Sequence, residues 1–107
     1  MPYRKVCDVN DVPEGTSFRV EHPSGALAVH NVDGEFYVTQ DRCTHDDWSL
    51  ADGYLENDVI ECTLHWAKFS VKTGKVLAPP ACQALKIYPV RVVGEDIEVD
   101  VEAGHLT

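Results

Sequence analysis

The chain has 107 residues, a length that predicts one small domain. Hydrophobic residues make up 44% and charged residues 25%, which is the composition of an ordinary globular protein. Acidic residues outnumber basic ones 18 to 9, and the formal charge of −9 excludes nucleic acid as the main partner, because phosphate binding needs a basic face.

The first 40 residues predict a β-hairpin that follows one short helical turn. Residues 10–14 can form the turn, since the proline among them suits the first turn of a helix. Residues 26–30 (Ala-Leu-Ala-Val-His) and 35–39 (Glu-Phe-Tyr-Val-Thr) show the period-2 pattern of β-strands. The Asp33-Gly34 pair between them is a strong hairpin signal.

The middle of the chain is less regular. Residues 41–57 contain several turn formers and little alternation, which predicts a long loop with a functional purpose. Residues 58–62 and 66–71 predict two short strands, and Thr73-Gly74 predicts a turn after them.

The last part predicts two more strands, residues 85–93 and 96–101, joined by a turn at Gly94. Pro89 lies inside the first of them, so we expect that strand to be at an edge or bulged there. No segment carries a helical stripe of apolar residues. Short strands with frequent turns predict an all-β fold, an antiparallel sandwich or a barrel.

Two short motifs combine cysteine with histidine: Cys43-Thr44-His45 and Cys62-Thr63-Leu64-His65. Sixteen residues separate the two motifs. Each motif supplies one thiolate and one imidazole from a tight loop, so two loops placed side by side offer two sulfur and two nitrogen ligands.

The cysteine count of four also raises the question of disulfides in a secreted domain. The N-terminus has no apolar leader segment, and no run of about 18 apolar residues exists that could span a membrane. We therefore expect no membrane association and a reducing, cytoplasmic location, where patterned cysteine and histidine more often bind metal or catalyse a reaction.

Zinc bound by two cysteines and two histidines, as in a zinc-stabilised binding module, is one interpretation of the motifs. Zinc fingers usually keep the cysteines together and the histidines together, whereas each motif here mixes the two. The mixed order favours a Rieske-type [2Fe–2S] cluster, in which one iron takes the cysteines and the other takes the histidines.

Further segments narrow this interpretation. They are Asp52-Gly53-Tyr54-Leu55-Glu56, Lys68-Phe69, Thr73-Gly74-Lys75 and Ala78-Pro79-Pro80-Ala81-Cys82. With the two motifs, they make nearly the whole chain resemble the Rieske ferredoxins of bacterial aromatic-ring-hydroxylating dioxygenases of the biphenyl, toluene and naphthalene types. The resemblance implies one [2Fe–2S] cluster per chain, with one iron held by Cys43 and Cys62 and the other by His45 and His65.

The resemblance also implies the architecture. The family fold is an antiparallel β-sandwich with a small inserted cluster-binding subdomain. That subdomain is expected at residues ~41–84, and the base subdomain at ~1–40 and ~85–107, with boundaries good to a few residues. The Pro79-Pro80 segment would form a third loop that covers the cluster.

The implied function is one-electron transfer. The chain has no mononuclear iron motif, nucleotide-binding glycine loop or nucleophile–base pair, so it is not expected to be an enzyme. The resemblance implies an NADH-dependent flavin reductase as electron donor and a Rieske non-haem iron oxygenase as acceptor, with a monomeric shuttle between them. A small subunit of an assimilatory nitrite reductase is the alternative within Rieske chemistry.

Departures from the Rieske proteins of respiratory and photosynthetic complexes predict a low reduction potential. Those proteins add a second cysteine to each ligand loop, and the two form a disulfide; the corresponding positions here are Trp48 or a neighbour and Leu64. They also have hydroxyl groups after the second motif, where this chain has Ala67 and Phe69. Fewer hydrogen bonds to sulfur, together with the charges of Asp46 and Asp47, disfavour the added electron. We expect a potential of roughly −150 mV, near the low end of the Rieske range.

The cysteines, histidines and tryptophans outside the ligand set are mostly expected to have structural roles. Cys7 and Cys82 are expected to be partly buried thiols. The histidines outside the motifs are expected to lie on strands or on the surface rather than to bind metal; they are His22, His30 and His105. Trp66 is expected to pack near the cluster, and for Trp48 packing and partner contact remain equally open.

Overall fold

The structure is a computed structural model that describes residues 3–23, 25–42, 49–62, 67–78 and 83–106. These residues form three short 3₁₀ helices, η1 (Val9–Asp11), η2 (Leu50–Asp52) and η3 (Val101–Ala103). The strands are β1 (Tyr3–Asp8), β2 (Ser17–Val20), β3 (Leu27–Val32), β4 (Glu35–Gln40), β5 (Tyr54–Glu56), β6 (Val59–Glu61), β7 (Lys68–Ser70), β8 (Val76–Ala78), β9 (Ile87–Tyr88), β10 (Val90–Val93) and β11 (Asp96–Asp100).

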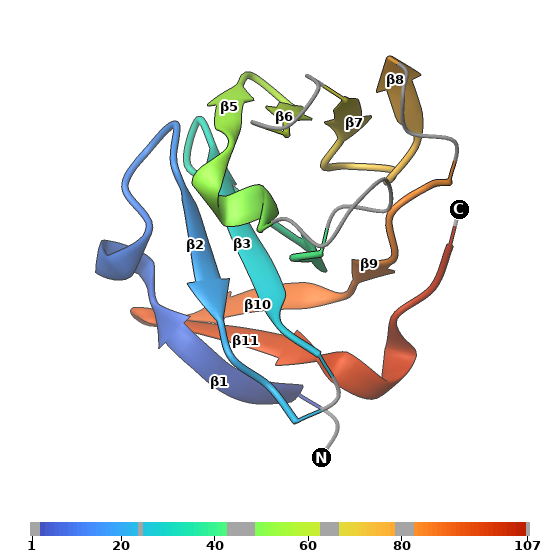
Figure 1. The fold of residues 1–107 in the computed structure, drawn as a ribbon. Coiled ribbons are helices and arrows are strands. Elements are labelled where there is room, and N and C mark those ends of the chain that lie inside the picture. Colours follow the sequence, from blue (N-terminus) through green and yellow to red (C-terminus); the bar gives the residue numbers. More distant parts are fainter. Residues whose placement is uncertain (1–2, 24, 43–48, 63–66, 79–82, 107) are drawn as a thin grey trace.

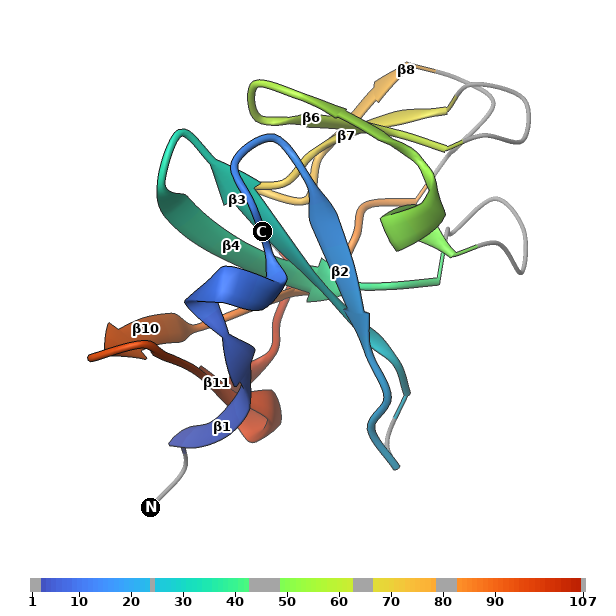
Figure 2. The ribbon, with the colours of Figure 1, turned by 90° about the vertical axis from the view of Figure 1, so that its left-hand side faces the viewer.

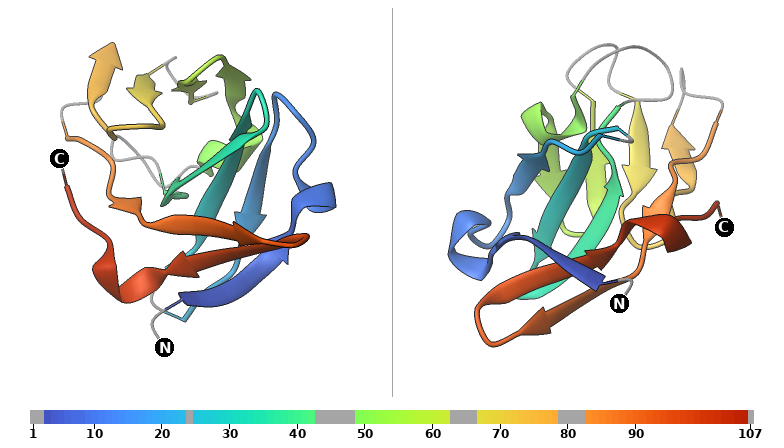
Figure 3. Two further views of the ribbon diagram at one scale, coloured as in Figure 1. Left: turned by 180° about the vertical axis from the view of Figure 1, so that it is seen from behind. Right: turned by 90° about the horizontal axis from the view of Figure 1, so that it is seen from below.

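The strands form three antiparallel sheets, which confirms the all-β prediction. Their strand orders are β1-β11-β10, β2-β3-β4-β9 and β5-β6-β7-β8. In Figure 1 the β5–β8 sheet lies at one end of the molecule and the β1-β11-β10 sheet at the other. In Figure 3 the β1-β11-β10 strands run across those of the central sheet.

The predicted hairpin is the centre of the fold. β3 and β4 pair in register from Leu27 opposite Gln40 to Val32 opposite Glu35. Asp33 and Gly34 in the turn have φ angles of 53° and 89°. Positive φ at both central positions is the mark of a type I′ turn, whose twist matches that of the strands.

β3 is covered on both of its faces, and for this reason it is buried from Leu27 to Asn31. Leu27 and Val29 belong to the hydrophobic core shared with the β1-β11-β10 sheet. Val32 packs against the core of the β5–β8 sheet, and alternation along the strand puts His30 on that same face. The central sheet is therefore the middle of three layers, as Figure 2 shows.

The core on one side of the central sheet is entirely aliphatic apart from one thiol. Its buried members come from β1, the residue after η1, β3, β4 and β11, and they are Cys7, Val12, Leu27, Val29, Val38, Ile97 and Val99. The strand predicted over residues 96–101 forms β11 as far as Asp100, and its buried residues, Ile97 and Val99, alternate with less buried acidic ones.

The β5–β8 sheet has a core of its own. Its buried members are Leu50, Ile60, Cys62, Ala67, Phe69, Val71 and Leu85. The sheet is inserted between β4 and β9, which are hydrogen-bonded neighbours in the central sheet. It falls inside the range ~41–84 expected for a cluster-binding subdomain, whose limits remain a prediction.

Pro89 marks a change of sheet. The run 85–93, predicted as one irregular strand, is divided at this residue into β9, which pairs with β4, and β10, which pairs with β11. A proline has no N–H to donate to a ladder, so it suits the point where the chain leaves one sheet for another.

Several short elements differ from the sequence-based expectations. The expectation of a long loop over residues 41–57 is wrong in its second part, which forms η2 and β5. The predicted turn over 10–14 is a 3₁₀ helix that ends at Asp11, before the proline that suggested it. β1, β2 and β8 had no alternation strong enough to predict them.

Candidate metal centre

Of the four predicted ligands, Cys62 is among the residues that the structure describes. Cys43, His45 and His65 lie outside them, and so do Asp46, Asp47, Trp48, Trp66 and Cys82. Cys62 follows β6 directly and is completely buried in the core of the β5–β8 sheet. The second motif therefore begins where β6 ends, with its thiol among apolar side chains.

The second motif is closed at its base by the β6–β7 hairpin. Glu61 pairs with Lys68, and the N–H of Cys62 donates to the carbonyl oxygen of Ala67 over 2.8 Å. The Lys68 ammonium lies 3.6 Å from a Glu61 carboxylate oxygen at the same level of the hairpin. The two ends of the segment 63–66 are thus fixed to each other.

Ala67 and Phe69 are both fully buried in this core. Both lie in the cluster that contains Ile60 and Cys62, against which Val32 and Tyr37 of the central sheet pack. Neither side chain carries a hydroxyl group, so these two positions offer no side-chain hydrogen-bond donor to a cluster.

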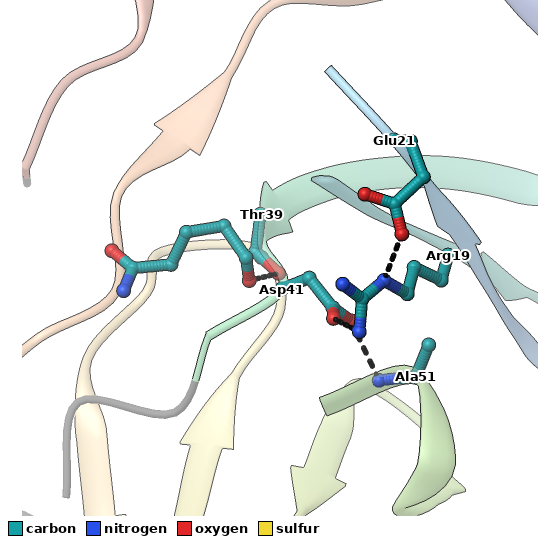
Figure 4. A network of polar contacts seen from close by, with 6 residues as sticks. Arg19, Glu21, Thr39, Asp41 and Ala51 are labelled. Carbon is teal, nitrogen blue, oxygen red and sulfur yellow. Dashed lines mark hydrogen bonds and ion pairs between the residues drawn. The ribbon is translucent and has the colours of Figure 1, made fainter. Parts of the chain in front are cut away.

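The first motif has a base built from Asp41, Arg42, Ser49 and η2. Arg42 and Ser49 form an isolated antiparallel bridge, and the N–H of Leu50 donates to the Asp41 carbonyl oxygen over 2.7 Å. The N–H of Ala51 donates to Asp41 Oδ1 over 2.9 Å, as Figure 4 shows. The segment 43–48 therefore leaves and re-enters the structure at adjacent points.

The bases of the two motifs lie against each other. Leu50 and Cys62 belong to one core cluster, and Tyr54 pairs with Glu61 across β5 and β6. Gly53 lies in such close contact with the Glu61 carbonyl oxygen that an added Cβ would overlap it. The end of the first loop is thus packed on the strand that leads to Cys62.

A glutamine connects the first motif to the segment after the two prolines. Gln40 Nε2 donates to the Arg42 carbonyl oxygen over 2.8 Å, and the N–H of Lys86 donates to Gln40 Oε1 over 2.8 Å. Ala78 pairs with Lys68 before the segment 79–82. All three predicted cluster loops therefore begin and end in one connected framework, although residues 79–82 themselves are not described.

Sequence reasoning predicted four ligands, which stay a prediction, and missed this framework. Gln40 and Asp41 carry it, and neither stands out in the chain except that Asp41 comes two residues before the first motif. A single polar residue between a strand and a metal-binding motif is a weak signal, because most such residues are exposed to solvent.

His30 is a buried strand histidine, in agreement with the expectation that it does not bind metal. Its Nδ1 lies 2.7 Å from Ser17 Oγ and its Nε2 lies 2.9 Å from Thr39 Oγ1. Because the Thr39 hydroxyl donates to the Gln40 carbonyl oxygen, it must accept from Nε2–H, and the ring is neutral with Nδ1 as acceptor. Burial lowers the pKa of His30 to about 3.

The match to a protein-family model decides the identity of this framework. Residues 3–89 match the model of the Rieske [2Fe-2S] domain. The chain belongs to the Rieske [2Fe-2S] domain family. As a Rieske protein it is a one-electron carrier that holds a [2Fe–2S] cluster, and its role is electron transfer rather than catalysis.

Relatives of this Rieske protein are similar along their full length. It is 52% identical over 101 residues to the biphenyl dioxygenase ferredoxin subunit of Pseudomonas sp. (strain KKS102), covering 94% of this chain and 93% of that protein. It is 50% identical over 107 residues to the biphenyl 2,3-dioxygenase ferredoxin component of Rhodococcus jostii (strain RHA1), covering 100% of both chains.

A solved structure confirms the Rieske ferredoxin fold. A chain in a complex of reduced oxygenase and oxidized ferredoxin of carbazole 1,9a-dioxygenase superposes with a TM-score of 0.86 and 38% sequence identity, covering 92% of each chain.

No helix in the described part of our chain is long and apolar enough to cross a membrane.

The residues present fit a cluster of this kind. Cys62 offers a buried sulfur ligand at the joint between the two loop bases. Ser49 Oγ is buried and has no hydrogen-bond partner among the described residues, so the end of the first loop retains a donor suited to sulfide or thiolate acceptors. The described residues alone contain no group of three possible metal ligands, which is consistent with the other ligands coming from 43–48 and 63–66.

Proposed function

We propose that this Rieske ferredoxin passes electrons from an NADH-dependent flavin reductase to the Rieske non-haem iron oxygenase of an aromatic-ring dioxygenase system, in the cytoplasm. The observation that carries the proposal is the full-length similarity to two biphenyl dioxygenase ferredoxin components. The oxygenase as partner is further supported by the related ferredoxin chain that was solved together with an oxygenase. The donor is inferred from the family resemblance alone.

The proposed ligand set is Cys43 and Cys62 on one iron and His45 and His65 on the other. It is supported by the framework in which the bases of the first and second loops share Leu50, Gly53 and Glu61. When bound, the cluster accepts and releases one electron. The chain holds its Cys62 ligand in a water-excluded core, which limits access of solvent and of oxidants to the sulfur.

The cofactor and its ligands are tested together by EPR spectroscopy after reduction with dithionite. The purified protein is expected to be reddish-brown and to give a rhombic signal with the low average g value of a Rieske centre. Cys62→Ala is expected to lose both, whereas Cys7→Ala, which alters the opposite core, keeps them. A colourless protein with stoichiometric zinc would show that the zinc-stabilised module is the right interpretation.

The place in a dioxygenase system is tested by reconstitution. The ferredoxin is mixed with the flavin reductase and oxygenase of a biphenyl dioxygenase, and NADH oxidation is coupled to formation of a cis-dihydrodiol. Turnover that depends on the ferredoxin supports the proposal. A protein that purifies only in a fixed complex with a nitrite reductase, and that does not support dihydrodiol formation, would contradict it.

A further inference from the structure

We propose that Asp41 is a positioning residue for the first ligand loop and that its buried charge lowers the reduction potential of the cluster, with Arg19 from β2 moderating that charge. The inference rests on the proposed function, because it assumes that Cys43 and His45 in this loop bind the cluster. It concerns Asp41, which precedes the loop, Ala51, which follows it, and Arg19 on β2.

Asp41 holds three separate parts of the chain together. Its N–H donates to the Ala26 carbonyl oxygen over 3.0 Å, and its own carbonyl oxygen accepts from the N–H of Leu50 over 2.7 Å. Its side chain, only 2% exposed, accepts from the N–H of Ala51 over 2.9 Å. One residue thereby joins the β2–β3 connection, the start of the first loop and the helix η2 that follows it.

The short length of the loop makes this contact important for the ligands. Six residues, 43–48, separate Arg42 from Ser49. Asp41 precedes that segment and accepts hydrogen bonds from the N–H groups of Leu50 and Ala51, which follow it. The exit continues through η2 to Gly53, which packs on Glu61 immediately before Cys62. A shift of the Asp41 carboxylate would therefore move the first loop relative to the second motif.

The Asp41 carboxylate is charged, buried and only partly neutralised. Arg19 Nη1 lies 3.5 Å from Asp41 Oδ2, but the Arg19 side chain is 48% exposed and its Nε donates to Glu21 over 2.8 Å. Figure 4 shows the guanidinium between the two carboxylates. A buried charge is screened less than an exposed one, so the charge on Asp41 disfavours an additional electron on a nearby cluster more than surface acids do.

The two roles of Asp41 are separated by two substitutions. Asp41→Asn keeps a carbonyl oxygen that accepts from Ala51 and removes the charge, so we expect normal cluster content, unchanged g values and a higher midpoint potential. Asp41→Ala removes the acceptor oxygen as well as the charge. We therefore expect altered g values and a loss of cluster absorbance several-fold faster than in the wild type. Arg19→Gln, which leaves the carboxylate in place, is expected to lower the potential.

Glu21→Gln is the matched control, because this residue contacts the same guanidinium but its side chain is 78% exposed. It should leave potential, g values and cluster lifetime unchanged. The proposal is overturned if Asp41→Ala shows the wild-type g values, potential and cluster lifetime, or if Asp41→Asn and Arg19→Gln both keep the wild-type potential. The second criterion still decides if Asp41→Ala does not fold.

The experiment also distinguishes this proposal from the function on which it rests. The Rieske EPR signal of the wild-type protein is recorded first, and its absence would refute the cluster itself. A normal wild-type signal with insensitive Asp41 and Arg19 variants would refute only the positioning role.

Discussion

Gly53 and Glu61 are in backbone contact across the joint between the two ligand-loop bases. A Cβ atom on Gly53 would overlap the carbonyl oxygen of Glu61 and would also lie 3.1 Å from the carbonyl oxygen of Leu50. The φ angle of Gly53 is −83°, a value open to any residue, so glycine is required here by space rather than by conformation. The residue after Glu61 is Cys62, the proposed ligand, which lies in the same core as Leu50.

We expect Gly53→Ala to destabilise the protein by about 2–3 kcal/mol, as overpacking at a closely packed site does. Gly34→Ala in the β3–β4 turn is the control, since its φ of 89° is unfavourable for alanine but the space around it is open. Gly34→Ala should lower the free energy of unfolding by about 1 kcal/mol. Thermal melting and the decay of cluster absorbance should rank Gly53→Ala as the more damaged variant, and an equal effect of both would contradict the packing argument.

The central hairpin and the last strand could be predicted because their signals are local. Asp33-Gly34 determines the turn between β3 and β4, and the alternation from Ile97 onward reflects a strand with one buried face. The burial of β3 on both faces could not be predicted from residues 26–30, because it is the inserted sheet that covers the second face. Nothing within a single strand can reveal that a distant insertion will cover it.

The spacing of the motifs predicts the ligand set, which stays a prediction, but it does not predict the residues that support the ligand loops. Gln40 and Asp41 act through partners far along the chain, Lys86 and Ala51, whose backbone groups carry no side-chain signature. The division of the run 85–93 at Pro89 has a similar cause, since the sheet to which each half belongs depends on β4 and β11.

Burial of neutral His30 predicts a pH-dependent stability. Its pKa is about 3 in the folded protein and near the ordinary 6.5 in the unfolded chain, so between these values the unfolded state binds the extra proton. The stabilisation is complete above pH 6.5 and is lost as pH falls towards 3, by up to about 1.4 kcal/mol per pH unit. Melting temperatures should therefore fall by about 5 °C per unit between pH 6 and 5.

His30→Gln should flatten this slope even if it lowers the melting temperature at pH 7, because the substituted side chain does not titrate. His105→Gln, which removes an exposed histidine, should keep the wild-type slope. A wild-type slope in His30→Gln would show that some other group causes the acid sensitivity.

Cys7 should resist thiol reagents in the folded protein. Its side chain lies in the core between β1 and the central sheet, and burial raises its pKa to about 11. Because the thiolate is the reactive form, both access and ionisation are suppressed. Peptide mapping after iodoacetamide treatment should find Cys7 unmodified in native protein and modified after denaturation, and rapid native labelling would contradict its burial.

The reduction potential should reflect the missing hydroxyl donors and the charges beside the first motif. With no hydroxyl donors at Ala67 and Phe69, the midpoint potential should be roughly −150 mV, and a value above zero would refute the reasoning. Reversing the charges of Asp46 and Asp47 to lysine should raise the potential, because positive charge next to an iron ligand favours the added electron.

The same double variant tests whether donor and acceptor use one surface. We expect electrons to enter and leave near the histidine ligands, so charge reversal at Asp46 and Asp47 should change transfer rates with reductase and oxygenase alike. Glu95→Lys, an exposed change in the turn between β10 and β11 far from the inserted sheet in Figure 1, should alter neither rate. Stopped-flow measurement with each partner separately decides the matter, since an effect on only one partner would mean that the two proteins dock at different surfaces.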